Sequence, residues 1–183
     1  MTDRDPSPLA TFVAAVAFAA EKHRTQRRKD AAASPYINHP IALAQVLSAE
    51  GGVVDPVVLC AAVLHDTVED TETTEAELVA AFGPKIAATV LEVTDDKTLE
   101  KPARKEQQVA RAAHSSREAQ LVKLADKICN VRDILASPPA GWSPERRHEY
   151  LVWSSRVVAG LRGVHPGLEA IFDGLIARSA EVG

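Results

Sequence analysis

The sequence is poor in aromatic residues and in cysteine. Phe, Trp and Tyr make up 4% of the 183 residues, so the core must be built mainly from Ala, Val, Leu and Ile, a composition that favours closely packed helices. Only Cys60 and Cys129 are present, each inside an apolar helical pattern and far from any CxxC spacing. This pattern predicts reduced core thiols and no need for an oxidising compartment.

An excess of positive charge and a long apolar run are also lacking. The formal net charge is −4, which argues against a general nucleic-acid binder, so we expect no specific nucleic-acid partner. No run reaches the roughly 18 apolar residues of a membrane span. The segment from Leu9 to Ala20 is apolar, but the residues before it include Asp3 and Asp5 and form no positive region, unlike a signal peptide. We therefore expect a cytoplasmic protein that does not associate with membranes.

Turn signals predict an all-α fold of about eight helices, in one domain spanning residues 1–183, without a convincing strand. Hydrophobic residues make up 46% and charged residues 25%, as in ordinary globular domains. Asn38 is a candidate cap, with Pro40 in the first turn of its helix, and Thr74 with Glu77 forms a candidate capping box. That box opens a short helix that ends at Gly83. The other predicted helices cover residues 7–24, 38–50, 55–70, 84–94, 101–113, 116–135, 143–161 and 166–180.

The segment VLHDTVED, residues 63–70, places polar residues where the pattern predicts burial. On a continuous helix with about 100° per residue, the side chains of His65, Asp66, Glu69 and Asp70 project from one sector. The preceding VVLCAAVL is apolar all round, which indicates a central helix. Burying three carboxylates and an imidazole together would be very costly without a cation. A divalent metal removes that cost.

Two further polar residues lie far from this segment in the sequence. Asp126 stands among apolar residues of LVKLADKICNVRDIL, and His39 lies at a helix start in YINHP. Taken alone, Asp126 is equally well a satisfied structural carboxylate, and His39 is more often a capping or core residue. Together with the His65-Asp66 pair, they predict a site of two imidazoles and two carboxylates.

The order His, His-Asp, Asp resembles the signature of the HD phosphohydrolase superfamily. Other segments narrow the resemblance: FAAEKHRTQRRKD, PYINHPIALA, AAVLHDTVEDTETT, FGPKIAATVLEVTDDKTL, HSSREAQLVKLADKICNVRDI and GWSPERRHEYLVWSSRVVAGL. They are similar to small alarmone hydrolases and to the hydrolase half of long RelA/SpoT proteins, over about residues 12–178. The long proteins also carry a synthetase domain, for which 183 residues leave no room.

The resemblance implies removal of pyrophosphate from the 3′ position of (p)ppGpp, giving GDP or GTP. It implies His39, His65, Asp66 and Asp126 as metal ligands and manganese as the metal, although the donor types would also suit Fe²⁺ or Zn²⁺. It further implies that Glu69 and Asp70 orient and activate the attacking water.

The resemblance also implies a set of substrate-binding residues. Arg28 and Lys29 would pack against the guanine base, to which a planar guanidinium is suited. Asn130, one helical turn after Asp126, would contact the nucleoside. Arg146 and Tyr150 occupy positions similar to substrate contacts.

Apart from the resemblance, Lys97 and the nearby Lys101, Arg104 and Lys105 form a basic stretch that could contact phosphates, since a net-acidic protein needs local cations to bind such a substrate. A solvated helix face is an equally good interpretation of this stretch.

Several alternatives stay open. The same metal site suits a phosphatase acting on NADPH or another nucleotide, and the same pocket suits a non-catalytic alarmone sensor. The loop HRTQRRKD reads equally as a solvated basic loop or a weak RNA-binding patch. Trp142 and Trp153 are expected to be packing residues, and the oligomeric state is not determined by the sequence.

Overall fold

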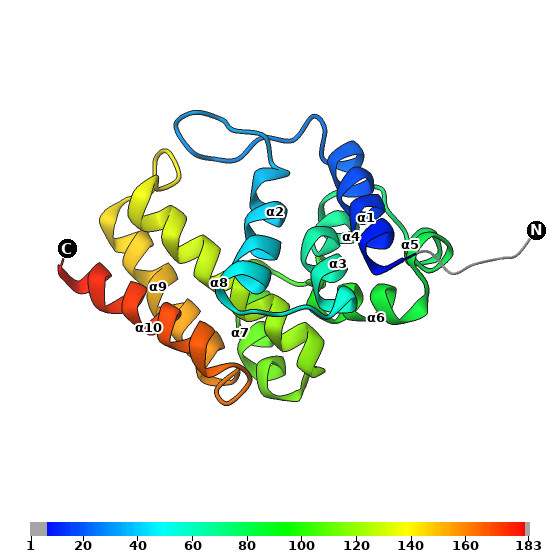
Figure 1. The fold of residues 1–183 in the computed structure, drawn as a ribbon. Coiled ribbons are helices and arrows are strands. Elements are labelled where there is room, and N and C mark those ends of the chain that lie inside the picture. Colours follow the sequence, from blue (N-terminus) through cyan, green and yellow to red (C-terminus); the bar gives the residue numbers. More distant parts are fainter. Residues whose placement is uncertain (1–6, 182–183) are drawn as a thin grey trace, which may run out of the picture.

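The computed structural model describes residues 7–181, and these residues are almost entirely helical (Figure 1). No strand is present among them, only an isolated bridge between Arg27 and Pro35. The α-helices are α1 (Pro8–Lys22), α2 (Asn38–Gln45), α3 (Pro56–Leu64), α4 (Thr67–Asp70), α5 (Glu75–Phe82), α6 (Pro84–Val93), α7 (Lys101–Arg111), α8 (Arg117–Ala136), α9 (Pro144–Ala159) and α10 (Pro166–Glu181). A π-helical turn, Val46–Glu50, continues α2, and a 3-10 turn, Ala112–His114, continues α7. The all-α prediction is confirmed.

Helix α3 forms the centre of the core, as its unbroken apolar sequence predicts. It packs against α1, α2, α6 and α8, and in Figure 1 α2 stands between α3 on one side and α8 on the other. Val58 and residues 60–64 of α3 are at most 1% exposed. Cys60 and Cys129 are buried free thiols, as expected. The core is therefore aliphatic, and it fixes where the two ends of α3 lie.

Side-chain caps account for many of the helix starts. The side chains of Ser7, Asp55, Thr74, Ser116 and Ser143 each accept a hydrogen bond from a backbone N–H of the first turn. Such caps satisfy donors that have no partner inside the helix. Because these residues are readable in the sequence, most of the predicted boundaries agree with the structure to within one or two residues.

The predicted cap at Asn38 is wrong. Helix α2 begins at Asn38 itself, and Ile37 before it has helical backbone angles and makes no side-chain cap. The backbone N–H groups of Asn38 and His39 donate to the carbonyls of Pro35 and Tyr36 instead. The preceding turn thus supplies the acceptors, and no side-chain oxygen is required.

The continuous helix predicted over residues 55–70 is also wrong, because it is interrupted at His65 and Asp66 between α3 and α4. The His65 ring donates to the Ala62 carbonyl at 2.9 Å, and the Thr67 hydroxyl donates to the Leu64 carbonyl at 2.7 Å. Local side-chain bonds of this kind compete with the helical ladder. The break changes the directions in which His65 and Asp66 project.

Among residues 7–181, none of the helices has the length and apolar character that crossing a bilayer requires.

Candidate active site

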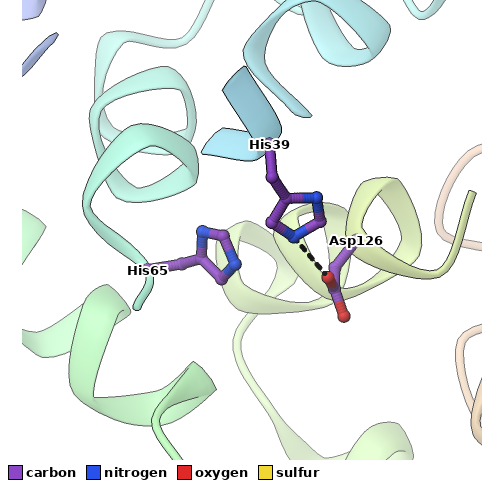
Figure 2. A group of neighbouring side chains, drawn as sticks. All are labelled: His39, His65 and Asp126. Carbon is purple, nitrogen blue, oxygen red and sulfur yellow. Dashed lines mark ion pairs between the residues drawn. The ribbon is translucent and has the colours of Figure 1, made fainter. Parts of the chain in front are cut away.

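Three separate helical elements bring His39, His65 and Asp126 together (Figure 2). His39 lies at the start of α2, His65 follows the last residue of α3, and Asp126 lies within α8. One potential ligand atom of each residue lies within 4.8 Å of the others, and His39 Nε2 is 3.2 Å from Asp126 Oδ1. Figure 2 shows the two imidazole rings next to one another, with the Asp126 carboxylate beside His39, and the rings meet edge-on with their centres 5.3 Å apart.

The hydrogen bonds of His65 identify Nε2 as the ring nitrogen that would bind a metal ion. Because Nδ1 of His65 bonds to the Ala62 carbonyl, which can only accept, Nδ1 carries the proton. In the protonated ring Nε2 donates to Asp66 Oδ2, 2.8 Å away, and a metal ion would take the place of that proton.

Asp66 lies against the same cluster, on the side of His65. Its Oδ2 is 2.8 Å from His65 Nε2 and accepts a hydrogen bond from the hydroxyl of Tyr36. Asp66 is not part of the group whose ligand atoms all lie within 4.8 Å of one another, so it is the most displaced of the four predicted ligands. Carboxylates that bind metals are usually oriented by a hydrogen bond from a neighbouring group, and the Tyr36 hydroxyl would supply it here.

Electrostatics keep both carboxylates ionised. Burial by itself raises the pKa of Asp66, but the His65 ring outweighs it, and the net pKa is lowered. For Asp126, burial is likewise outweighed by Lys127, whose Nζ lies 2.9 Å from Oδ2, and by His39, so its pKa is also lowered. Two imidazoles and two ionised carboxylates in a buried cluster fit a divalent cation, and these donor types do not select one ion.

Glu69 and Asp70 are the last two residues of α4, and each is held by the loop after α6. The Asp95 backbone N–H donates to Glu69 Oε2 at 3.1 Å, and Lys97 Nζ lies 2.6 Å from Asp70 Oδ1. Burial raises the pKa of Glu69 above its ordinary value. A carboxylate with a raised pKa is better suited to accept a proton near neutral pH than an ordinary one.

A pocket of about 510 Å³ opens beside the cluster and brings four of the predicted substrate residues together. Arg28, Lys29, Asn130 and Tyr150 line it, together with His39 and Asp70. Arg28 is ion-paired with Asp133, and Asn130 Nδ2 donates to Asp126 Oδ1 at 2.6 Å. The pocket has the volume of a small-molecule site.

Lys97 and Arg146 lie outside the lining of this pocket. Lys97 is half exposed and pairs with Asp70. Arg146 stacks over the Trp142 ring at 4.5 Å and lines a neighbouring pocket of about 450 Å³. Four of the six predicted substrate residues therefore line one cavity, and the other two lie outside its lining.

Three residues near the site were given no functional part by the sequence analysis. Tyr36 donates to Asp66, Lys127 pairs with Asp126, and Trp142 lines both pockets rather than packing in the core. Lys127 is only 2% exposed, and its ammonium lies 4.2 Å from the centre of the Trp153 ring. Trp153 is buried, as predicted. A lysine amid the apolar residues of α8 was the available signal, since buried lysines need a partner.

The helical fold and the buried His–His–Asp cluster define the class of metal-dependent phosphohydrolases. A family model described as HD domain matches residues 15–155, and the chain belongs to this family.

Named relatives and solved structures agree with this assignment. The guanosine-3′,5′-bis(diphosphate) 3′-pyrophosphohydrolase MESH1 of Xenopus tropicalis is 53% identical over 167 residues, covering 91% of this chain and 93% of that protein. The human protein of the same name is 54% identical, over 89% of this chain and 91% of its own. A solved structure of a metazoan SpoT orthologue, described as hydrolysing ppGpp, superposes with a TM-score of 0.91 at 46% identity, over 96% of this chain and 97% of that one.

Proposed function

We propose that this protein hydrolyses the 3′-pyrophosphate of (p)ppGpp, giving GDP or GTP and pyrophosphate. The observation that carries the proposal is the buried cluster of His39, His65 and Asp126 at the edge of a pocket of nucleotide size. The relatives named as 3′-pyrophosphohydrolases support the choice of substrate, because they are similar over nine-tenths of the chain.

His39, His65, Asp66 and Asp126 are the proposed ligands of a divalent ion, which we propose to be manganese. These four residues would hold the ion, which would supply Lewis-acid assistance to a phosphoryl oxygen and lower the pKa of water. The short contact between His39 Nε2 and Asp126 Oδ1 supports this set, since both atoms point to one position in the interior.

Glu69 and Asp70 are proposed to orient the attacking water and accept its proton. The water oxygen bonds to the phosphorus that carries the ribose 3′ oxygen, that P–O bond breaks, and the 3′ oxygen takes up a proton. The Asp95 N–H fixes the Glu69 carboxylate, and the raised pKa of Glu69 suits it to the transfer. Lys97 holds Asp70 at 2.6 Å.

The nucleoside is proposed to occupy the larger pocket. Arg28 and Lys29 would face the guanine base from the loop before α2, and Asn130 and Tyr150 would contact the nucleoside from α8 and α9. The ion pair with Asp133 keeps the Arg28 guanidinium in a fixed orientation, which lowers the entropic cost of stacking on a base. Arg146 and Lys97 are proposed to act at the margin of the site.

The decisive experiment adds purified protein to (p)ppGpp with Mn²⁺ and measures released pyrophosphate, then repeats the assay with a chelator. We expect turnover only with the metal. NADPH assayed in parallel tests the phosphatase alternative: faster release of phosphate from NADPH than of pyrophosphate from (p)ppGpp would contradict the proposed substrate. Tight nucleotide binding without hydrolysis would instead support the sensor. The cytoplasmic location stays a prediction.

A further inference from the structure

Two side chains at the end of α1 connect this helix to the end of α4. His23 follows the last residue of α1, and Gln26 lies three residues further on. The side chain of Gln26 bonds in two directions: its Nε2 donates to the backbone carbonyl of Asp70 at 2.6 Å, and its Oε1 lies 2.6 Å from Nδ1 of His23. Neither residue has a part in the reaction proposed above.

The partners fix the position of each proton in this chain of hydrogen bonds. A carbonyl oxygen only accepts, so the amide nitrogen of Gln26 must face Asp70. The amide oxygen then faces His23 and accepts from it, so Nδ1 of His23 carries a proton. Reversal of the amide would place an oxygen against the Asp70 carbonyl. The imidazole therefore selects the one amide orientation that can hold the end of α4.

Stability alone does not favour a histidine at position 23. The residue is 1% exposed, and its Nε2 is buried without a hydrogen-bond partner within the described residues. An unpaired acceptor in the interior costs stability, which an apolar side chain of similar size would avoid. The hydrogen bond from Nδ1 to Gln26 is what an apolar side chain could not supply. The contact with Gln26 is therefore the physical reason for a histidine here.

Helix α4 needs support from outside because it is a single turn. It has four residues, Thr67–Asp70, and a helix of that length is not stable by itself. The carbonyl of its last residue, Asp70, has no partner inside a helix and requires a donor from elsewhere. Gln26 supplies that donor at the residue whose carboxylate is proposed to handle the attacking water.

Backbone hydrogen bonds in turn hold Gln26 in place. Its N–H donates to the His23 carbonyl at 2.9 Å, and its carbonyl accepts from the N–H of Tyr36 at 3.1 Å. The rings of His23 and Tyr36 also pack together, with their centres 4.9 Å apart. Since the Tyr36 hydroxyl donates to Asp66, one small cluster contacts both ends of the segment from Asp66 to Asp70.

We propose that His23 and Gln26 are positioning residues, which hold the end of α4 so that the Asp70 carboxylate faces the attacking water. The inference rests on the proposed function and adds to it two residues that act through Asp70. Gln26 lines the larger pocket, but His23 is not among the described residues that line it. The role of His23 can therefore be tested without removing a group that faces the substrate.

The test compares kcat and KM for ppGpp in His23→Leu, His23→Asn and the wild-type protein. Leucine fills the space but lacks the donor, so we expect kcat to fall about 10-fold to 100-fold, as for a reacting group displaced by about 1 Å, with a much smaller change in KM. The amide nitrogen of asparagine can take the place of Nδ1, so His23→Asn should restore most of the lost activity.

His165→Leu is the matched control, because it also removes a hydrogen-bonded histidine. The His165 ring bonds to the Gly51 carbonyl at 2.9 Å, and His165 lines neither of the two pockets that meet at Trp142. We expect wild-type kcat and KM in this variant. If kcat fell equally in the histidine-to-leucine variants at positions 23 and 165, the inference would be wrong.

A double variant separates positioning from a general loss of packing. If His23 acts through Asp70, His23→Leu should change kcat little in the background of Asp70→Asn, because the group that it positions is already lost. A full additional loss in that background would overturn the inference, and so would wild-type kcat in His23→Leu alone. Gln26→Met, which keeps the side-chain length, carries the same comparison if His23→Leu does not fold.

Failure of the proposed function gives a different result. If the wild-type protein does not hydrolyse ppGpp, the proposed reaction is wrong, and hydrogen exchange decides whether His23 holds α4. The backbone N–H of Thr71 donates to the Thr67 carbonyl at 3.1 Å and reports on this turn. It should exchange at least about 10-fold faster in His23→Leu than in His165→Leu. Equal exchange rates would eliminate the positioning role.

Discussion

Nε2 of His39 lies 3.2 Å from Oδ1 of Asp126, although α2 and α8 are far apart in the sequence. The other oxygen of Asp126 faces the Lys127 ammonium at 2.9 Å. One oxygen is therefore held by a cation of the protein, and the other points to the histidines. The proposed metal site thus includes an aspartate whose two oxygens are each oriented by a neighbouring side chain of the protein.

Loss of His39 should remove metal binding. We expect His39→Ala to weaken the affinity for Mn²⁺ by more than the 10-fold to 100-fold typical of residues that only support a ligand. Isothermal titration with Mn²⁺ measures the change. His148→Ala, at an exposed position of α9, is the matched control and should bind as the wild type does. Equal affinities in the two variants would remove His39 from the ligand set.

Tyr36→Phe should weaken metal binding without unfolding the protein. The variant keeps the ring packed against His23 and His39 but loses the hydroxyl that donates to Asp66. Since Asp66 is then free to turn, we expect Mn²⁺ affinity to fall about 10-fold to 100-fold. The same titration checks this, and wild-type affinity would show that Asp66 is positioned without the phenol.

Glu69→Gln should separate chemistry from metal binding. The amide oxygen still accepts from the Asp95 N–H, but the group no longer takes up a proton. We expect kcat for ppGpp to fall about 10²-fold to 10⁴-fold, with Mn²⁺ affinity close to that of the wild type. Glu72→Gln, at an exposed position just beyond α4, provides the control. A kcat within twofold of the wild type would remove Glu69 from the proton transfer.

The pair of Glu50 and Arg132 should make stability depend on pH. The two hydrogen bonds, both 2.7 Å, lower the pKa of Glu50 in the folded state. Its contribution is therefore present above the unfolded pKa of about 4.3 and is lost as pH falls through the lower folded pKa. Because both side chains are about one-third exposed, we expect Glu50→Gln to cost only about 0.5–1 kcal/mol at pH 7.

Urea unfolding of both proteins at pH 7 and pH 3 measures this effect. The difference in unfolding free energy should shrink from pH 7 to pH 3, since the contribution of the Glu50 carboxylate is lost as pH falls below the unfolded pKa and toward the lower folded pKa. A difference of the same size at both pH values would show that the variant acts through packing rather than charge.

Two glycine substitutions should have opposite effects on stability. A Cβ at Gly160 would lie 2.8 Å from the Ala112 Cβ, where the end of α9 crosses the 3-10 turn. We expect Gly160→Ala to cost about 1–3 kcal/mol. A Cβ at Gly174, within α10, meets no atom within 4 Å, so Gly174→Ala should be neutral or stabilise by up to about 1 kcal/mol. Thermal unfolding measures both effects. An equal shift of the melting temperature in the two variants would contradict this packing.

Most of the helices could be predicted because their signals are local. Thr74 acts as a cap, as the sequence predicts, and Ser7 and Ser143 cap helices whose starts were predicted to within one residue. The side-chain directions predicted for residues 63–70 assumed a continuous helix. That assumption was wrong for a local reason as well, since side-chain bonds of His65 and Thr67 break the helix there. A spacing of about 100° per residue predicts side-chain directions only while the helix is unbroken.

The contacts of the site were harder to predict because they join distant segments. Lys127 was readable as an unusual lysine on an apolar helix, but its stacking on Trp153 depends on how α8 and α9 cross. Likewise, Trp142 could not be assigned to the pockets before the positions of α7 and α9 were known.

The sequence by itself determined an all-helical chain, because periodicity and capping act over a few residues, and it predicted two histidines and two aspartates as metal ligands. Only the tertiary structure decided which oxygen of each aspartate faces the histidines, that Tyr36 supports Asp66, and that two pockets meet at Trp142 and Tyr150. These features depend on the angles and distances at which separate helices pack, and no single segment specifies them.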